Sequence, residues 1–181
     1  GGVAVMNVAK WDGASWSAMG SGIGDPSASV YDLQYDGTYL YACGMFWDGG
    51  GKARVAKWDG SSWTDVGGGV GDDSFAMAHD GTNLYAGGKF TTPGSYVAKW
   101  NGTAWSALGS GVNSTVWSLA HDGTALYAGG QFSTAGGIPA ANIAMWTPTV
   151  ATNPGVAPLS GSWTGGYEVV IMGYNLGNGT D

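Results

Sequence analysis

Short apolar runs, each closed by a turn signal, recur along the first 146 residues of the chain. One stretch has such runs at 96–100, 105–108, 116–121 and 125–130, separated by Asn101-Gly102, Gly109 and Asp122-Gly123. Asp-Gly and Asn-Gly pairs between apolar runs are strong hairpin signals, because these residues accept the positive φ of a tight turn. The pattern therefore predicts four short antiparallel strands in each unit.

The units are copies of one another. Residues 55–90 and 97–132 align without a gap, and 8–46 align with them after a short insertion. Trp11, Trp58, Trp100 and Trp146 share one position of the repeat, at spacings of 47, 42 and 46 residues. A period in the forties is typical of a four-stranded β-propeller blade and also of helical repeats such as armadillo. The glycine density and the strand signals exclude the helical alternative.

Composition supports a folded, turn-rich, all-β chain. Of the 181 residues, 35 are glycine and only 10% are charged, which on its own would suggest disorder. The chain also has 10 Trp, 9 Tyr and 4 Phe, an amount of aromatic surface that disordered chains lack. Both faces of a propeller blade pack on neighbouring blades, so its strands need not alternate between apolar and polar residues.

We therefore predict an all-β fold, with a β-propeller of four-stranded blades over 1–147, of which about three repeats are visible. Glycine pairs inside strands, such as Gly129-Gly130, indicate close approach of another backbone segment. Trp11, Trp58, Trp100 and Trp146 are the predicted structural core of the repeat. We expect Trp11, Trp58 and Trp100 to be largely buried between adjacent sheets.

The first and last repeats are partial. Residues 1–11 match 136–146 in register, so the chain begins halfway through a unit and holds two full blades and two partial ones. Closed propellers use about four to eight blades. We therefore expect that the chain does not act as an isolated monomer. Further sequence of the same polypeptide, or neighbouring copies, would cover the open edges, and repeated head-to-tail contacts between copies would build a filament.

Two segments resemble known families. The repeat motifs Asn-x-Ala-Lys-Trp-Asp-Gly-x-x-Trp and Leu-Tyr-Ala-Gly-Gly-x-Phe resemble kelch-related propeller repeats of large secreted or surface proteins, including the extracellular part of fungal cortical polarity-marker proteins. After a linker at 148–154, residues 155–181 resemble the start of an IPT/TIG immunoglobulin-like β-sandwich, through a Pro-x-Ser-Gly start, a Gly-Gly pair and Gly-x-Asn-Leu. The resemblance implies an interaction scaffold at the cell surface or outside the cell, without shared catalytic residues.

The charge pattern narrows the partners. The net charge is −7 with only six Lys and Arg, which argues against nucleic acid, because phosphate binding needs clustered cations. No apolar run reaches the roughly 18 residues of a membrane span. The single cysteine, Cys43, excludes an internal disulfide framework. The expected partners are proteins, further copies of the chain or glycans.

No catalytic, cofactor or metal site is predicted. His79 and His121 occupy one repeat position beside the turn residues Asp80 and Asp122, so we expect their imidazoles to bond the adjacent hairpin. Cys43 and Tyr41 invite comparison with copper radical oxidases, which join a kelch-type propeller to an immunoglobulin-like domain. Those enzymes need a tyrosine–cysteine crosslink and histidine ligands, whereas Cys43 here replaces a repeat glycine.

Candidate surface sites remain. Asn101, Asn113 and Asn178 begin Asn-x-Ser/Thr sequons and are predicted N-glycosylation positions, Asn113 foremost because it lies in a variable loop. Trp47 and Trp117 do not recur as tryptophan in every unit and are the candidates for sugar stacking. Three functions follow, in order: a non-catalytic extracellular structural, adhesion or interaction scaffold, which could be a subunit of a surface assembly; a carbohydrate-binding propeller; and a relative of the copper radical oxidases.

Overall fold

A computed structural model describes residues 4–46 and 54–148 of the chain. Every regular element in these residues is a β-strand, and none of them lies in a helix, so the all-β prediction is confirmed. The predicted immunoglobulin-like segment at 155–181, most of the linker, Trp47 and Asn178 lie outside the described residues.

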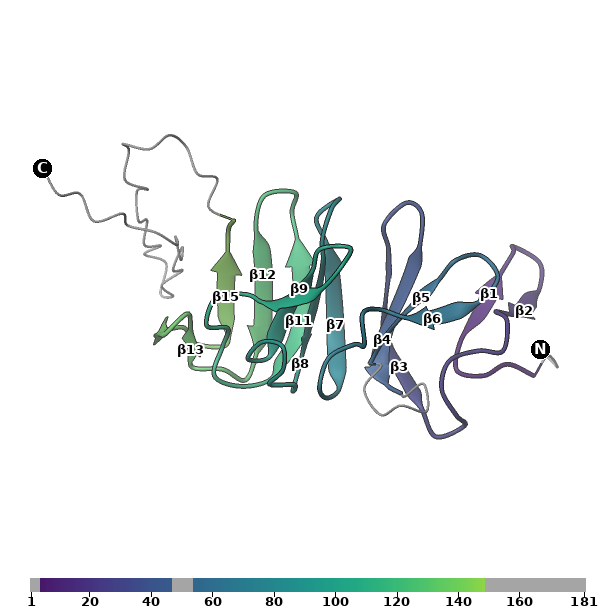
Figure 1. Ribbon diagram of the computed structural model, residues 1–181, viewed down its shortest axis with the longest axis horizontal. Helices are drawn as coiled ribbons and strands as arrows, with labels where there is room; N and C mark the ends of the chain where they lie inside the picture. The colour runs from purple at the N-terminus through teal and green to yellow at the C-terminus, as the bar shows by residue number, and fades with distance from the viewer. Residues whose placement is uncertain (1–3, 47–53, 149–181) are drawn as a thin grey trace, which may run out of the picture.

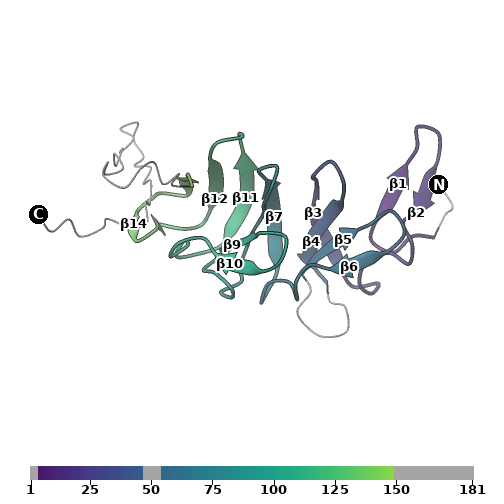
Figure 2. The same ribbon diagram turned by 45° about the horizontal axis from the view of Figure 1, so that its top comes forward.

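Two complete four-stranded antiparallel sheets form the centre of the structure (Figures 1 and 2). Sheet I contains β3 (Ser29–Tyr35), β4 (Leu40–Met45), β5 (Val55–Trp58) and β6 (Trp63–Asp65). Sheet II contains β7 (Ser74–His79), β8 (Leu84–Gly88), β9 (Val97–Trp100) and β10 (Trp105–Ala107). In both sheets each strand pairs with the next one along the chain, as the positions of the turns predict.

Incomplete sheets flank these two. On one side the hairpin of β1 (Ala9–Trp11) and β2 (Trp16–Ala18) repeats the pairing of β5–β6 and β9–β10. On the other, sheet III contains β11 (Val116–His121), β12 (Leu126–Gly130) and β15 (Ile143–Trp146). A small ribbon of β13 (Thr134–Ala135) and β14 (Ile138–Pro139) lies between β12 and β15 in the chain. Figure 1 shows the hairpin and β15 at opposite ends of the row of sheets.

A β-bulge marks the first strand of each of the three sheets. The register shifts around one extra residue, which is Tyr31 in β3, Phe75 in β7 and Trp117 in β11. Across from each bulge stands a glycine that has no room for a side chain. A Cβ at Gly130, for example, would clash with the carbonyl oxygen of Thr115. The predicted close backbone approach is thus confirmed at Gly130, across from the bulge, and was wrong at Gly129, where the nearest atom to an added Cβ is 3.8 Å away.

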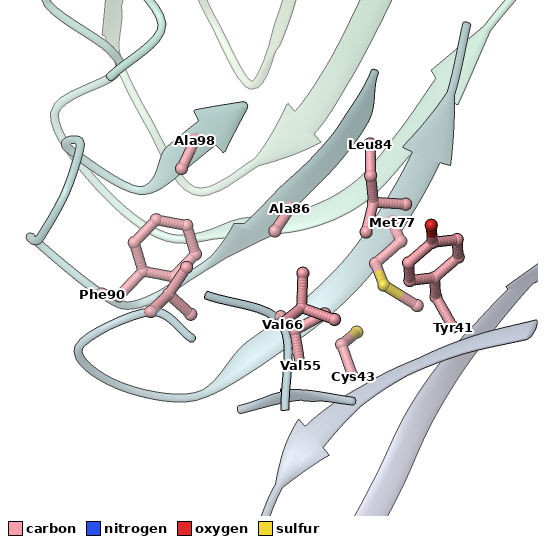
Figure 3. Packing of buried hydrophobic residues seen from close by; sticks show 10 residues of the cluster. Tyr41, Cys43, Val55, Val66, Met77, Leu84, Ala86, Phe90 and Ala98 are labelled. Atoms are coloured by element: carbon pink, nitrogen blue, oxygen red, sulfur yellow. The ribbon is translucent and has the colours of Figure 1, made fainter. Parts of the chain in front are cut away.

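The hydrophobic core lies between successive sheets. Between sheets I and II, Tyr41, Cys43 and Val55 pack with Met77 and Leu84 (Figure 3). The hairpin packs on sheet I and sheet II packs on sheet III in corresponding clusters. Sheet II is therefore covered on both faces, which explains why its inner strands lack a strict alternation of apolar and polar residues.

The expectation of three equally buried tryptophans was wrong for Trp11. Trp58 and Trp100 are partly buried, because their rings pack against the loops at Gly20 and Gly67 of the preceding hairpin or sheet. The ring of Trp11 is 49% exposed. Among the described residues no sheet lies on that side of the hairpin, so position in the repeat alone does not determine burial.

Candidate functional site

The three bulge residues form a continuous row of aromatic rings across sheets I, II and III, which we call the aromatic row. The ring centroids of Tyr31 and Phe75 are 5.4 Å apart, and those of Phe75 and Trp117 are 4.5 Å apart. The bulge turns each side chain toward the first strand of the next sheet, and β7 contacts both β3 and β11. Sequence reasoning treated Trp117 as a residue without repeat partners, whereas the aligned residues are also aromatic.

The geometry of the row leaves its two ends open. Phe75 and Trp117 stack with an interplanar angle of 23°, so one face of the indole is already occupied. Tyr31 and Trp117 are nonetheless 46% and 50% exposed. An aromatic ring with one open face can stack on a sugar, on a planar side chain or on a further ring. The row is therefore a candidate binding surface, with its open ring faces at its two ends.

A polar contact fixes the sheets beneath the row. The Asp32 carboxylate, next to the bulge in β3, accepts a hydrogen bond from the backbone N–H of Met77 at 2.7 Å. This bond joins the first strands of sheets I and II directly. It therefore keeps the two strands that carry Tyr31 and Phe75 together.

The exposed apolar surface continues along β3. Tyr31, Leu33 and Tyr35 follow one another along this strand and are 46%, 47% and 60% exposed; we call them the β3 stripe. The residues that correspond to Leu33 in the other sheets are Met77, which is buried, and Leu119, which packs against sheet II. A stripe that is covered in two repeats and open in the third is a candidate contact surface.

The Asp-Gly turns carry a recurrent hydrogen-bonded clasp. In sheet II, Asp80 accepts the backbone N–H groups of Thr82 and Asn83, and its second oxygen accepts the Tyr85 hydroxyl at 2.7 Å. Asp122 and Tyr127 repeat the contact at 2.9 Å. Burial opposes ionisation of Asp80, but the hydrogen bonds from Asn83 and Tyr85 outweigh it and hold the pKa of this carboxyl well below its usual range.

The two histidines belong to the same turns. The Nδ1 atoms of His79 and His121 accept the backbone N–H groups of Gly81 and Gly123, each at 3.0 Å. The predicted bonding of the imidazole to the adjacent hairpin is therefore confirmed. One nitrogen of each ring is committed to the turn, which assigns these histidines a structural role.

Cys43 lies in the core rather than at an accessible site. Its side chain is fully buried between sheets I and II, and burial raises the pKa of the thiol to about 12. A thiol that stays protonated is a poor nucleophile and a poor metal ligand. In the part of the chain that the structure describes, no group of three or more His, Cys, Asp or Glu side chains could hold a metal ion.

Two of the predicted glycosylation positions are described, and both are exposed. Asn101 uses its Oδ1 to accept the backbone N–H groups of Thr103 and Ala104 within its turn. Asn113 bonds to the β12–β15 connection: its Oδ1 accepts the N–H groups of Ser133 and Thr134, and its Nδ2 donates to Ser133 Oγ at 3.0 Å. Asn113 therefore has a structural role that the variable loop did not reveal.

A comparison with protein-family models gives no match, and neither does a comparison with curated proteins. Over the described residues there is also no helix with the length and apolar character of a membrane span.

Proposed function

We propose that this chain is a non-catalytic β-propeller scaffold, at the cell surface or outside the cell, that binds protein partners. The observation that carries the proposal is the aromatic row together with the β3 stripe. Contiguous exposed apolar surface is typical of interaction sites. Aromatic side chains also dominate the energetics of protein interfaces.

The propeller assignment rests on the series of sheets. Two antiparallel sheets have four short strands in chain order, and their first strands lie beside one another in the series β3, β7, β11. In a propeller, the first strands of successive blades surround a common axis. The resemblance of residues 155–181 to the start of an IPT/TIG domain supports a second, immunoglobulin-like module in this proposal.

Surface plasmon resonance with immobilised extracellular-matrix and cell-surface proteins tests the proposal. We expect at least one saturable partner, with binding weakened at least tenfold by Trp117→Ala, because this change removes an open end of the aromatic row. Met45→Gln is the matched control, since Met45 is exposed outside the row and the corresponding residue of the last repeat is Gln131. A partner affinity that is unchanged by Trp117→Ala, or no protein binding at all, would contradict the proposed function.

A carbohydrate ligand is the second candidate, and the open face of Trp117 favours it. Sugar rings stack on exposed indole faces, and Trp117 is half exposed at the end of the row. A glycan array with the parent chain and Trp117→Ala separates this function from the first. Trp16→Ala is the control, because Trp16 is equally exposed but lies on the hairpin, away from the row.

A further inference from the structure

The hairpin β1–β2 corresponds to the third and fourth strands of a complete four-stranded sheet. Trp11 and Trp16 face each other across the hairpin with ring centroids 5.4 Å apart, as do Trp58 and Trp63 at 5.4 Å. The pair in sheet I is partly buried, whereas Trp11 and Trp16 are 49% and 52% exposed. Among the described residues, no first and second strands lie beside β1.

Sheet III corresponds to the first three strands of a complete four-stranded sheet. Its third strand, β15, ends in Trp146, and no fourth strand pairs with it in the part of the chain that the structure describes. Trp58 and Trp100 contact Gly20 and Gly67, but nothing lies within 4 Å of a Cβ placed at the corresponding Gly109. An apolar cavity of about 50 Å³ lies there instead, between Gly109 and Trp146.

The faces at the two ends of the structure match. At the joint between sheets II and III, Leu119 packs against Gly87, and His121 stacks on Tyr85 with ring centroids 6.0 Å apart. The residues that correspond to Leu119 and His121 in β3 are Leu33 and Tyr35, which are exposed.

The surface of β8 that Leu119 and His121 contact also has an uncovered counterpart in β12 among the described residues. Tyr127 and Gly129 in β12 correspond to Tyr85 and Gly87 in β8. The nearest atom to a Cβ placed at Gly129 is 3.8 Å away and belongs to Ser118 of the same sheet, so no other sheet of the described residues covers this site. One end of the chain thus carries the surface that the other end is shaped to receive.

We propose that two copies of this chain associate head to tail by completing one four-stranded sheet between them. In this joint β12 of the first copy pairs with β1 of the second copy. β11 and β12 of the first copy then lie beside β3 of the second copy. Residues 1–11 align with 136–146, so β1 takes the place of β15 in the joint. The proposal rests on the proposed function, because it names a second copy as the partner of the β3 stripe and of the aromatic row.

Three structural features make β1 a better partner for β12 than β15 is. The hairpin brings β2 as the missing fourth strand, and Trp11 fills the apolar cavity at Gly109. Lys10 also restores the lysine found at Lys57 and Lys99, where β15 has Met145. The aromatic row continues across the joint, with the open face of Trp117 meeting Tyr31 of the second copy.

The joint also bears on the number of copies. After the exchange the described residues of each copy amount to three complete sheets, so two copies of this part of the chain form a closed ring of six. Propellers close with about four to eight blades, so a ring of two copies falls within this range and a ring of three does not. Head-to-tail contacts that close in this way give a discrete dimer rather than a fibre.

Cysteine cross-linking tests the strand exchange directly. Tyr85 and Lys99 are partners in sheet II, and the hydrogen bond from Gly88 N to Tyr96 O places them at a site without mutual backbone bonds, where Cβ atoms are close. The corresponding intermolecular pair is Tyr127 with Lys10. Mixing a Tyr127→Cys copy with a Lys10→Cys copy under mild oxidation is expected to give a disulfide-linked heterodimer.

The matched control replaces Lys10→Cys by Lys57→Cys, because Lys57 already faces Tyr41 inside sheet I and is expected to give no cross-link to Tyr127→Cys. Sedimentation of the 181-residue chain is expected to give a dimer, and Leu33→Asp, which charges the β3 stripe, a folded monomer. Met45→Asp is the control outside the joint and leaves the dimer intact.

A parent chain that stays monomeric, forms an open polymer, or cross-links equally at Lys57→Cys would overturn the proposal. A monomer whose Trp117 still mediates binding to another protein would overturn the self-association alone and leave the proposed function standing.

Discussion

At the residue scale, the repeat is stabilised by a few side chains that satisfy the backbone of its turns. Asp80 accepts two backbone N–H groups and a tyrosine hydroxyl, and His79 accepts a third N–H from the same turn. Hydrogen bonds to an ionised carboxylate are stronger than those between neutral groups. The conserved geometry of successive turns therefore comes from charge-assisted contacts rather than from glycine alone.

The clasp predicts a dependence of stability on pH. The pKa of Asp80 is lowered in the folded state, so its contribution is present above the ordinary carboxyl pKa and is lost as the pH falls through the folded value. Burial, followed by the hydrogen bond to Asp80 and then its charge, raises the pKa of Tyr85, so its contribution is lost as the pH rises through the folded-state pKa. We expect Tyr85→Phe to lower the free energy of unfolding by about 1–2 kcal/mol near neutral pH.

Urea unfolding of the parent and Tyr85→Phe at several pH values measures this contribution. The difference between the two should shrink at strongly acidic pH, where Asp80 is protonated, and again at strongly alkaline pH. A difference that stays constant over the whole range would show that the hydroxyl contributes by packing and not through the carboxylate.

At the element scale, β-bulges and ion pairs position one sheet against the next. The bulge re-aims one side chain of each first strand and so creates the aromatic row. Near the bulge of β7, Arg54 binds Asp73 at 2.8 Å, and both side chains are largely buried. This ion pair joins the connection before β5 to the start of β7, so it links sheet I to sheet II.

Removing the buried carboxylate is expected to weaken that link. Asp73→Asn should lower the free energy of unfolding by about 2–4 kcal/mol, because the contact with Arg54 is largely removed from water and costly to break, and the contact of Asp73 with Lys89 at 3.0 Å is weakened as well. Asp72→Asn is the matched control: its carboxylate is 46% exposed and lies 3.6 Å from Lys89, so we expect a loss below about 1 kcal/mol. Chemical denaturation measures both, and equal losses would show that the 2.8 Å contact has no special role.

At the scale of the whole molecule, the described residues form a row of sheets in which each packs on its neighbours along the series. Stability in such arrays is a sum of terms within repeats and terms between adjacent repeats. Residues at equivalent positions therefore differ in importance according to what lies beside them. The tryptophans of the repeat illustrate this. Trp58 and Trp100 pack against glycine loops of the preceding hairpin or sheet, whereas Trp11 on the hairpin is exposed to solvent.

We expect Trp58→Ala to lower the free energy of unfolding by about 3 kcal/mol, because its ring packs between the hairpin and sheet I. Trp11→Ala should cost less than about 1 kcal/mol in the free monomer, since that ring is exposed. Thermal unfolding under dilute conditions compares the two variants. Similar losses at both positions would show that Trp11 is covered in solution.

Local patterns predicted most of the fold. The turn pairs and apolar runs placed the strands to within about a residue, as at 116–121, which is β11 (Val116–His121). They also identified the structural role of His79 and His121 and the close approach at Gly130. These features depend on groups a few residues apart in a hairpin, so backbone geometry and side-chain chemistry within one repeat determine them.

Only the tertiary structure decided which surfaces are open. The sequence by itself determined the strands, the turns and the order of pairing, because these follow from local φ preferences and a short hydrophobic period. It did not reveal the aromatic row, since the bulges bring together rings from three repeats more than 40 residues apart. Trp11, Leu33 and Tyr35 are exposed while their counterparts are covered, because burial depends on whether a neighbouring sheet lies against each repeat.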